Sequence, residues 1–256
     1  MSLLEITNLS VRFGGLNALT DFKFALELGQ LLGLIGPNGA GKTTAFNVVT
    51  GVYKPNTGDI LLGGQSIAGK HPHQINQLGI ARTFQNVRLF GGLSVLENVL
   101  VGFNQSLTHG FAGTVLRTPR HQREDDQHET EAMNLLSTFH LDRRGQELAG
   151  SLPYGDQRRL EIARALATRP KILLLDEPAA GMNPQEKIEL MELIRFIRNR
   201  FKVGIWLIEH DMKLVMSICD QITVLDHGET IAVGPPAAVQ ADPKVCEAYL
   251  GEPVKI

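Results

Sequence analysis

The 256-residue sequence lacks the marks of several protein classes. It has only two cysteines, Cys219 and Cys246, which form neither a CxxC pair nor a disulfide framework. We therefore expect reduced thiols in a reducing compartment and no cysteine-based zinc site. No charge of one sign dominates, since 25 Lys and Arg residues face 27 Asp and Glu residues, for a net charge of −2. A dedicated nucleic-acid binder usually carries a strong basic excess, so we expect no nucleic-acid partner.

Export signals and long hydrophobic runs are also missing. The first residues reach Glu5 and Arg12 without the basic, apolar and small-residue regions of a signal peptide. The longest charge-free run, residues 98–116, is interrupted by polar residues such as Asn104 and His109, whereas a membrane-spanning helix needs about 20 predominantly apolar residues. With 43% hydrophobic and 20% charged residues, the composition predicts a soluble, folded chain.

Two kinds of strand pattern are present. Apolar and polar residues alternate over residues 4–7 and 22–29, which predicts antiparallel strands with one buried face. Residues 31–35, 171–176 and 203–208 are instead mostly continuous apolar runs, typical of strands covered on both faces. The sequence therefore predicts an α/β core with a mostly parallel sheet and an N-terminal antiparallel β subdomain.

Helical patterns separate the buried strands. Ser94 and Glu97 fit a capping box that opens a helix. Over residues 122–139 the charges crowd one face while apolar residues recur at helical spacing, which predicts a helix with a solvated side. Further helices are expected near residues 156–168 and 184–200.

One domain over residues 1–256 is the expected organisation. Residues 1–85 and 159–256 would form the core, and residues from about 86 to 158 an inserted helical subdomain. The His-Pro-His sequence at residues 71–73 has no companion metal ligands and predicts a loop.

Residues 36–43 carry a phosphate-binding motif. Their letters, GPNGAGKT, satisfy GxxxxGK[ST] between a buried strand and an expected helix, the context that indicates a P-loop. Glycines let successive N–H groups converge on phosphate oxygens, and the helix N-terminus adds the positive end of its dipole. We expect Lys42 to reach the β and γ phosphates and Thr43 to coordinate Mg²⁺.

Two acidic residues, Asp176 and Glu177, end a second buried run. Ligands of open α/β sheets bind at the carboxyl ends of such strands. Asp176 suits a place in the Mg²⁺ shell, and Glu177 suits a base that polarises the attacking water.

The order of these motifs makes the sequence similar to the nucleotide-binding subunits of ABC transporters over essentially the whole chain. The resemblance implies the P-loop NTPase fold of an ABC ATPase, which hydrolyses ATP with Mg²⁺. It implies that Gln85 contacts Mg²⁺ or water and senses the γ phosphate, and that His210 holds the γ phosphate and the attacking water. Phe13 resembles the aromatic residue that stacks on adenine, although it also continues the alternation of Leu9 and Val11 and could simply be core.

The implied site combines the P-loop with residues from later motifs. The implied catalytic residues are Glu177 and His210. The implied metal-binding residues are Thr43, Gln85 and Asp176. The implied nucleotide-binding residues are Phe13, Gly36, Pro37, Asn38, Gly39, Ala40, Gly41, Lys42, Thr43, Thr44, Gln85 and Asp176. Residues 178–183 resemble the family's D-loop, with Asn183 in place of the usual Asp.

The family's signature motif, usually LSGGQ, caps the γ phosphate of ATP held by the other subunit of a head-to-tail dimer. Its position is occupied here by Leu152, Pro153, Tyr154, Gly155, Asp156 and Gln157. Gly155 keeps the close approach that this contact requires, whereas Pro153 removes the serine hydroxyl and lacks an N–H. A homodimer would carry this weakened signature in both sites, so we favour pairing with a different ATP-binding chain.

Five segments narrow the resemblance to the LivG-like ATP-binding subunits of branched-chain amino-acid importers. They are residues 79–90, the insert around 105–130, residues 154–158, residues 209–216 and the tail at 249–252. The resemblance implies a peripheral subunit at the cytoplasmic face of the inner membrane, bound to permease subunits and served indirectly by a substrate-binding protein. Residues 86–93, with Phe90 between glycines, are either the permease contact or a plain surface loop.

Two other functions stay open at the level of sequence. The same ATPase module could serve lipopolysaccharide export or the uptake of urea or other amides. A soluble ABC ATPase of DNA repair or translation is the other alternative, but such proteins usually carry coiled coils, zinc motifs or tandem domains, and the sequence has none of these patterns.

Overall fold

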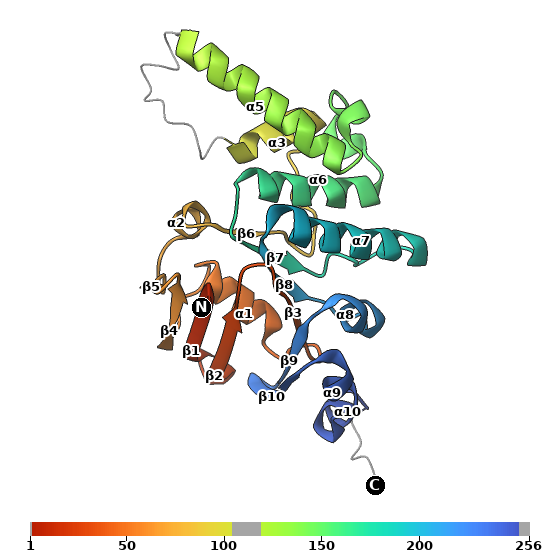
Figure 1. Cartoon of the computed structure of the whole chain (residues 1–256). Helices are drawn as coiled ribbons and strands as arrows, with labels where there is room; N and C mark the ends of the chain where they lie inside the picture. The colour runs from red at the N-terminus through yellow and green to blue at the C-terminus, as the bar shows by residue number, and fades with distance from the viewer. Residues whose placement is uncertain (1, 104–118, 251–256) are drawn as a thin grey trace. The chain divides into compact units, whose positions relative to one another are not determined.

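A computed structural model of the chain describes residues 2–103 and 119–250 (Figure 1). The chain divides into two compact units, which we call the core unit (Met1–Gln85 with Lys171–Ile256) and the helical unit (Asn86–Pro170). The helical unit extends past the boundary near residue 158 expected from the sequence, because the whole of α6 packs within it. Residues 105–118 of the insert and 251–252 of the tail lie outside the described residues.

An antiparallel sheet opens the core unit. Its strand order is β2-β1-β4-β5, and Leu4 pairs with Leu26 on one side and Leu62 on the other. Buried and exposed residues alternate along the start of β1 and the end of β2, which confirms the predicted half-buried pattern. The strands are β1 (Leu4–Phe13), β2 (Leu16–Leu26), β4 (Thr57–Leu62) and β5 (Gln65–Ser66).

A six-stranded, mostly parallel sheet forms the rest of the core, in the order β10-β9-β3-β8-β7-β6. All five residues of each of β3, β7 and β8 are buried, as the continuous apolar runs predict. Only the β9–β10 pair is antiparallel among the pairings described. The strands are β3 (Leu31–Ile35), β6 (Ile80–Arg82), β7 (Ile172–Asp176), β8 (Gly204–Ile208), β9 (Gln221–Asp226) and β10 (Glu229–Gly234).

Stacked aromatic side chains join the two sheets. Trp206 on β8 is fully buried, and its ring stacks on Phe24 of β2 with centroids 4.0 Å apart. Phe46 of α1 meets the Trp206 ring edge-on at 4.8 Å. Such a cluster buries large apolar surfaces in defined geometry, so it fixes α1, and the P-loop before it, against the sheet.

Helices complete the core unit. Those described are α1 (Lys42–Val49), α2 (Pro72–Gln77), α7 (Pro184–Phe201), α8 (Met212–Ile218), α9 (Pro236–Gln240) and α10 (Pro243–Leu250). The prediction of a loop at the His-Pro-His sequence was wrong. Pro72 is the first residue of α2, where its missing N–H costs no hydrogen bond, and the backbone N–H of His71 donates to Gln74 Oε1 at 3.0 Å.

Three main helices pack together in the helical unit: α3 (Val95–Phe103), α5 (Pro119–Thr138) and α6 (Tyr154–Ala167). The predicted capping box is confirmed, since Ser94 N–H donates to Glu97 Oε2 at 2.7 Å and Glu97 N–H donates to Ser94 Oγ at 3.1 Å. Ala132 and Leu136 on α5 are fully buried, so the apolar stripe of this charged helix faces the interior. None of the helices in residues 2–103 and 119–250 combines the length and apolarity of a membrane span.

Candidate active site

The expected site residues of the core unit follow neighbouring parallel strands. The P-loop follows β3, residues 209–211 follow β8, Glu177 follows β7, and Gln85 lies shortly after β6. Strands β3, β8, β7 and β6 are consecutive in the sheet, so four segments distant in sequence meet at one edge. The order of the strands in the sheet therefore explains why these motifs lie close together.

At two positions of the P-loop, neighbouring backbone leaves no room for a side chain larger than that of glycine. Gly36 has φ 150°, and a Cβ there would lie 2.0 Å from the carbonyl oxygen of Leu225. Gly41, the residue before α1, has φ 103°, and its Cβ would lie 2.5 Å from the carbonyl oxygen of Ala18. Any other residue at these positions would change the backbone path of the loop. That path leads into the N-terminus of α1, where backbone N–H groups can bind an anion such as phosphate.

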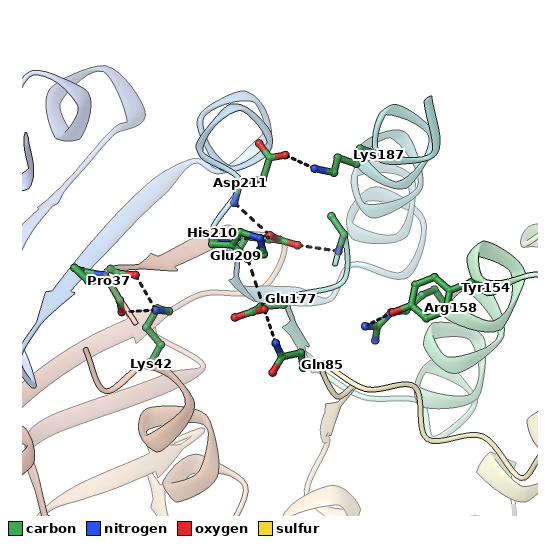
Figure 2. Close-up of polar contacts among 12 residues, drawn as sticks. Pro37, Lys42, Gln85, Tyr154, Arg158, Glu177, Lys187, Glu209, His210 and Asp211 are labelled. Atoms are coloured by element: carbon green, nitrogen blue, oxygen red, sulfur yellow. Dashed lines mark hydrogen bonds and ion pairs between the residues drawn. The ribbon is translucent and has the colours of Figure 1, made fainter. Parts of the chain in front are cut away.

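Lys42 lies at the start of α1 with its side chain folded back over the loop. Its ammonium donates hydrogen bonds to the carbonyl oxygens of Gly36 at 2.7 Å and Pro37 at 2.8 Å (Figure 2). Burial lowers the pKa of Lys42, and the carboxylates of Glu177 and Asp176 oppose that shift. A cation held at the mouth of the P-loop suits a phosphate-binding role.

Phe13 is not a core residue. It is 44% exposed, whereas Leu9 and Val11, which precede it in the alternation, are buried. Its ring packs edge-on against Tyr53 with centroids 5.1 Å apart. A pocket of about 340 Å³ brings Phe13 together with Gly39, Ala40, Gly41, Lys42, Thr43 and Thr44. The structure thus places a partly exposed aromatic residue beside the P-loop, and its stacking on adenine stays a prediction.

Asp176 ends β7 and is almost completely buried. Its Oδ2 accepts a hydrogen bond from Arg82 at 2.8 Å, and the same guanidinium donates to Asn47 Oδ1 of α1 at 2.7 Å. Arg82 therefore fixes the carboxylate relative to the helix that follows the P-loop. Sequence reasoning missed this arginine, because its partners become visible only once β6 and β7 pair.

Glu177 has a left-handed backbone, with φ 46°. This conformation costs a non-glycine residue on the order of 1 kcal/mol or more, and such strain is often concentrated at functional sites. Its Oε2 accepts a hydrogen bond from Gln85 Nε2 at 2.8 Å and lies 3.6 Å from His210 Nδ1 (Figure 2). The structure thus brings together three of the residues expected to act on the γ phosphate and water.

Asn183 begins α7 rather than standing free in the D-loop. Its Oδ1 accepts from the backbone N–H of Glu186 at 3.0 Å, and the Asn183 N–H donates to Glu186 Oε2 at 2.8 Å. This is a capping box with Pro184 at the first helical position. The sequence NPQE carries that signal, which our sequence reasoning overlooked in favour of the D-loop resemblance.

Glu209 is the second residue that sequence reasoning missed. It lies between β8 and His210 and is fully buried. Burial raises the pKa of its carboxyl, and hydrogen bonds from backbone N–H groups and the neighbouring His210 oppose this shift. A buried acid beside an expected catalytic histidine has no signal in a lone sequence, because an exposed glutamate would look the same.

The signature residues lie at the start of α6 in the helical unit. Pro153 is the residue before the helix, and its carbonyl oxygen accepts the N–H of Gln157 at 3.0 Å. The Gln157 side chain donates to the Leu152 carbonyl oxygen at 2.9 Å. Tyr154 and Gly155 therefore stand in the first turn, where backbone N–H groups point out of the helix end.

The donor set suits Mg²⁺ with a nucleotide. Thr43 is an exposed residue in the first turn of α1, and Asp176 is a nearly buried carboxylate oriented by Arg82. Oxygen ligands of this kind are those that Mg²⁺ prefers in proteins.

Comparison with known families gives the site its context. A family model described as "ABC transporter" matches residues 19–180. The chain belongs to the ABC transporter family. A second model, described as "Branched-chain amino acid ATP-binding cassette transporter", matches residues 229–255.

Close relatives cover the full length of this ABC protein. The high-affinity branched-chain amino acid transport ATP-binding protein LivG of Escherichia coli K12 is 48% identical over 250 residues, which cover 98% of both chains. The corresponding protein BraF of Pseudomonas aeruginosa is 46% identical over the same share of both chains. The lipopolysaccharide export system ATP-binding protein LptB of Haemophilus influenzae is 34% identical over the full length of both chains.

Solved structures agree. An ATP-binding cassette of an ABC transporter in its ADP conformation superposes with a TM-score of 0.85 at 30% identity, covering 98% of this chain and all of the other. A nucleotide-free ATP-binding cassette gives the same score and identity. The chain is therefore an ATP-binding and ATP-hydrolysing subunit of the ABC transporter type.

Proposed function

We propose that this chain powers the import of branched-chain amino acids. The observation that carries the proposal is full-length identity of 46–48% to BraF and LivG, joined to the match of residues 229–255 to the branched-chain amino-acid family. Substrate choice in such systems belongs to other subunits, so the proposal concerns the transporter in which this motor works.

In the proposed mechanism the core unit holds the nucleotide. Phe13 stacks on the adenine, while the backbone N–H groups of the P-loop and the Lys42 ammonium bind the phosphates. Thr43, Gln85 and Asp176 would hold Mg²⁺, which when bound neutralises charge on the phosphates. The P-loop, Gln85 and Asp176 lie at the sheet edge described above, and Phe13, at the end of β1, borders the same pocket as the P-loop.

Glu177 is the proposed base. Its Oε2 accepts a proton from the attacking water, and the 2.8 Å hydrogen bond from Gln85 holds that oxygen in place. His210, whose side chain is 61% exposed, is free to turn its Nδ1 from the 3.6 Å contact with Glu177 toward the γ phosphate.

Leu152, Pro153, Tyr154, Gly155, Asp156 and Gln157 would cap the γ phosphate of a second ATP-binding subunit. Because Pro153 weakens this signature, the proposed partner is a different ATP-binding chain. Permease subunits complete the complex, with residues 86–93 as their contact and a substrate-binding protein acting indirectly. This arrangement places the chain at the cytoplasmic face of the inner membrane.

The competing proposal is lipopolysaccharide export. The 34% identity to LptB supports it, and the branched-chain family match at residues 229–255 weighs against it. The module is shared between these transporter types, so the ATP site alone does not separate them.

Transport by the reconstituted complex tests the proposal. The chain would be assembled in proteoliposomes with candidate permease subunits and a candidate binding protein. Uptake of radiolabelled leucine would be compared with transport of urea and of lipopolysaccharide. We expect ATP-dependent leucine uptake, competed by isoleucine and valine. Transport of one of the other substrates without leucine uptake would overturn the assignment.

A further inference from the structure

The Glu209 carboxylate joins two loops of the core unit. One is the D-loop, residues 178–183, which follows Glu177, and the other is residues 209–211, which we call the switch loop. Glu209 Oε1 accepts a hydrogen bond from the backbone N–H of Ala179 at 2.8 Å. Its Oε2 accepts from the N–H groups of His210 at 3.1 Å and Asp211 at 3.4 Å (Figure 2).

These three partners are all donors. A carboxylate can accept all of them, whereas a neutral amide offers one oxygen and would turn its NH₂ group toward an N–H. Burying a charge without hydrogen bonds costs free energy. Glu209 is fully buried, so its charged form depends on these N–H donors. Burial raises the pKa of Glu209, and the N–H donors oppose the shift.

A second contact joins the same two segments farther along the chain. Lys187 Nζ on α7 lies 2.7 Å from Asp211 Oδ2, and Asp211 Oδ1 caps α8 by accepting the N–H of Leu214 at 3.2 Å. The switch loop is thus attached at both ends to the segment that begins with Glu177. The Ala179 contact with Glu209 is the nearer of the two to Glu177 along the chain.

We propose that Glu209 is a positioning residue that sets the separation of the base and the switch histidine. It holds the D-loop backbone two residues after Glu177 and the backbone of His210 at the same time. The 3.6 Å contact between Glu177 Oε2 and His210 Nδ1 then follows from one buried side chain, whose own Oε2 lies 3.8 Å from the same His210 Nδ1. This role rests on the proposed ATPase site and goes beyond it, since neither the motifs nor the resemblance gives Glu209 a role in that site.

The test compares Glu209→Gln with Glu209→Asp and with the matched control Glu192→Gln, an exposed position on α7. Glutamine keeps the size of the side chain but only one acceptor oxygen, and aspartate keeps the charge on a shorter side chain. Each variant of the full chain is measured for binding of a fluorescent ATP analogue and for amide hydrogen exchange at Ala179, His210 and Asp211. Steady-state ATP hydrolysis is measured in the assembled transporter.

We expect Glu209→Gln to lower kcat about ten-fold or more while the affinity for the ATP analogue stays within about two-fold. Amide exchange at Ala179 should rise by about ten-fold, with the rest of the sheet protected as in the wild type. Glu209→Asp should retain part of the kcat, because its carboxylate can still accept from one loop. Glu192→Gln should change neither quantity.

Unchanged exchange at Ala179 together with unchanged kcat would overturn the role. Loss of the cooperative thermal transition in both Glu209 variants would also overturn it, since the carboxylate would then be needed by the whole fold and not by two loops. Wild-type protein that fails to hydrolyse ATP would count against the proposed ATPase site instead, and the exchange measurement would still decide the role of Glu209.

Discussion

The core unit and the helical unit present polar groups in different ways. In the core unit, the two carboxylates expected to act on the nucleotide are each oriented by a hydrogen bond from another side chain. Gln85 donates to Glu177, and Arg82 donates to Asp176. In the helical unit the side chains around the signature bind one another. Arg158 donates to the Tyr154 hydroxyl at 3.0 Å (Figure 2), and Asp156 lies 3.2 Å from Arg144.

The difference shows what each unit can supply. A helix leaves its first N–H groups without partners inside the helix, so the start of α6 offers backbone donors and little side-chain chemistry. The core unit instead supplies charged side chains: the proposed base Glu177, the Lys42 ammonium and the Asp176 carboxylate. We therefore propose that nucleotide binding and proton transfer belong to the core unit, and that the helical unit caps a phosphate.

Of the substitutions that test this difference between the units, Glu177→Gln should have the largest effect, and that effect is on ATP hydrolysis. Hydrolysis should fall by about 10²- to 10⁴-fold, because glutamine cannot accept the proton of the attacking water. ATP binding should be retained, because the P-loop and Lys42 are untouched. Turnover in the assembled transporter and the affinity for an ATP analogue measure the two quantities. Glu192→Gln serves as the control for the chemical change, and unchanged turnover would remove Glu177 as the base.

Pro153→Ser probes the helical unit with a smaller effect. A serine before α6 restores a hydroxyl next to the helix end, and hydrolysis by the chain without a different ATP-binding partner should rise about five-fold, the equivalent of ~1 kcal/mol. Pro153→Ala is the matched control, since it removes the ring without adding the hydroxyl. If the purified chain alone already matched the assembled transporter, and serine changed nothing, a weakened signature would be ruled out.

Lys187→Met probes the attachment between α7 and the switch loop and has the smallest effect. The Lys187 and Asp211 side chains are 32% and 22% exposed, so the loss should be about 0.5 kcal/mol of unfolding free energy. The hydrogen bond with Lys187 lowers the pKa of Asp211 below its ordinary 3.8, and the same bond raises the pKa of Lys187 above its ordinary 10.5.

The directions of the two pKa shifts determine how the loss of unfolding free energy in Lys187→Met depends on pH. The Asp211 contribution is present above pH 3.8 and disappears as pH falls through the lowered pKa, and the Lys187 contribution is present below 10.5 and disappears as pH rises through the raised pKa. Denaturant unfolding of wild type and Lys187→Met from about pH 5 to about pH 9 should therefore give a constant difference. A difference that varied steeply near neutrality would contradict the pairing.

Local patterns predicted much of the fold. Continuous apolar runs identified β3, β7 and β8, and the Ser94–Glu97 capping box identified the start of α3, because these signals lie within a few residues of one another. The loop predicted at His71 became α2, since Pro72 at the first helical position favours a helix start.

Site residues could be predicted where a short sequence motif indicates their role. They could not be predicted where their role depends on which strands pair in the sheet. The P-loop follows a buried strand, and Asp176 and Glu177 stand at the end of another, so all three could be located from sequence. Arg82 and Glu209 act through contacts made only when β6, β7 and β8 lie side by side in the sheet. No spacing along the chain encodes those contacts, and so sequence reasoning left both residues without a role.

The division of labour between the units is tested most directly by one paired measurement, on Lys42→Ala and Gly155→Leu. Affinity for a fluorescent ATP analogue at low protein concentration, and turnover in the assembled transporter, are determined for both variants. We predict that Lys42→Ala weakens binding about ten-fold or more, because a charge-assisted contact to phosphate is lost, whereas Gly155→Leu leaves binding within about two-fold and lowers turnover. Tight ATP binding by Lys42→Ala, or loss of binding in Gly155→Leu, would contradict the assignment of nucleotide binding to the core unit.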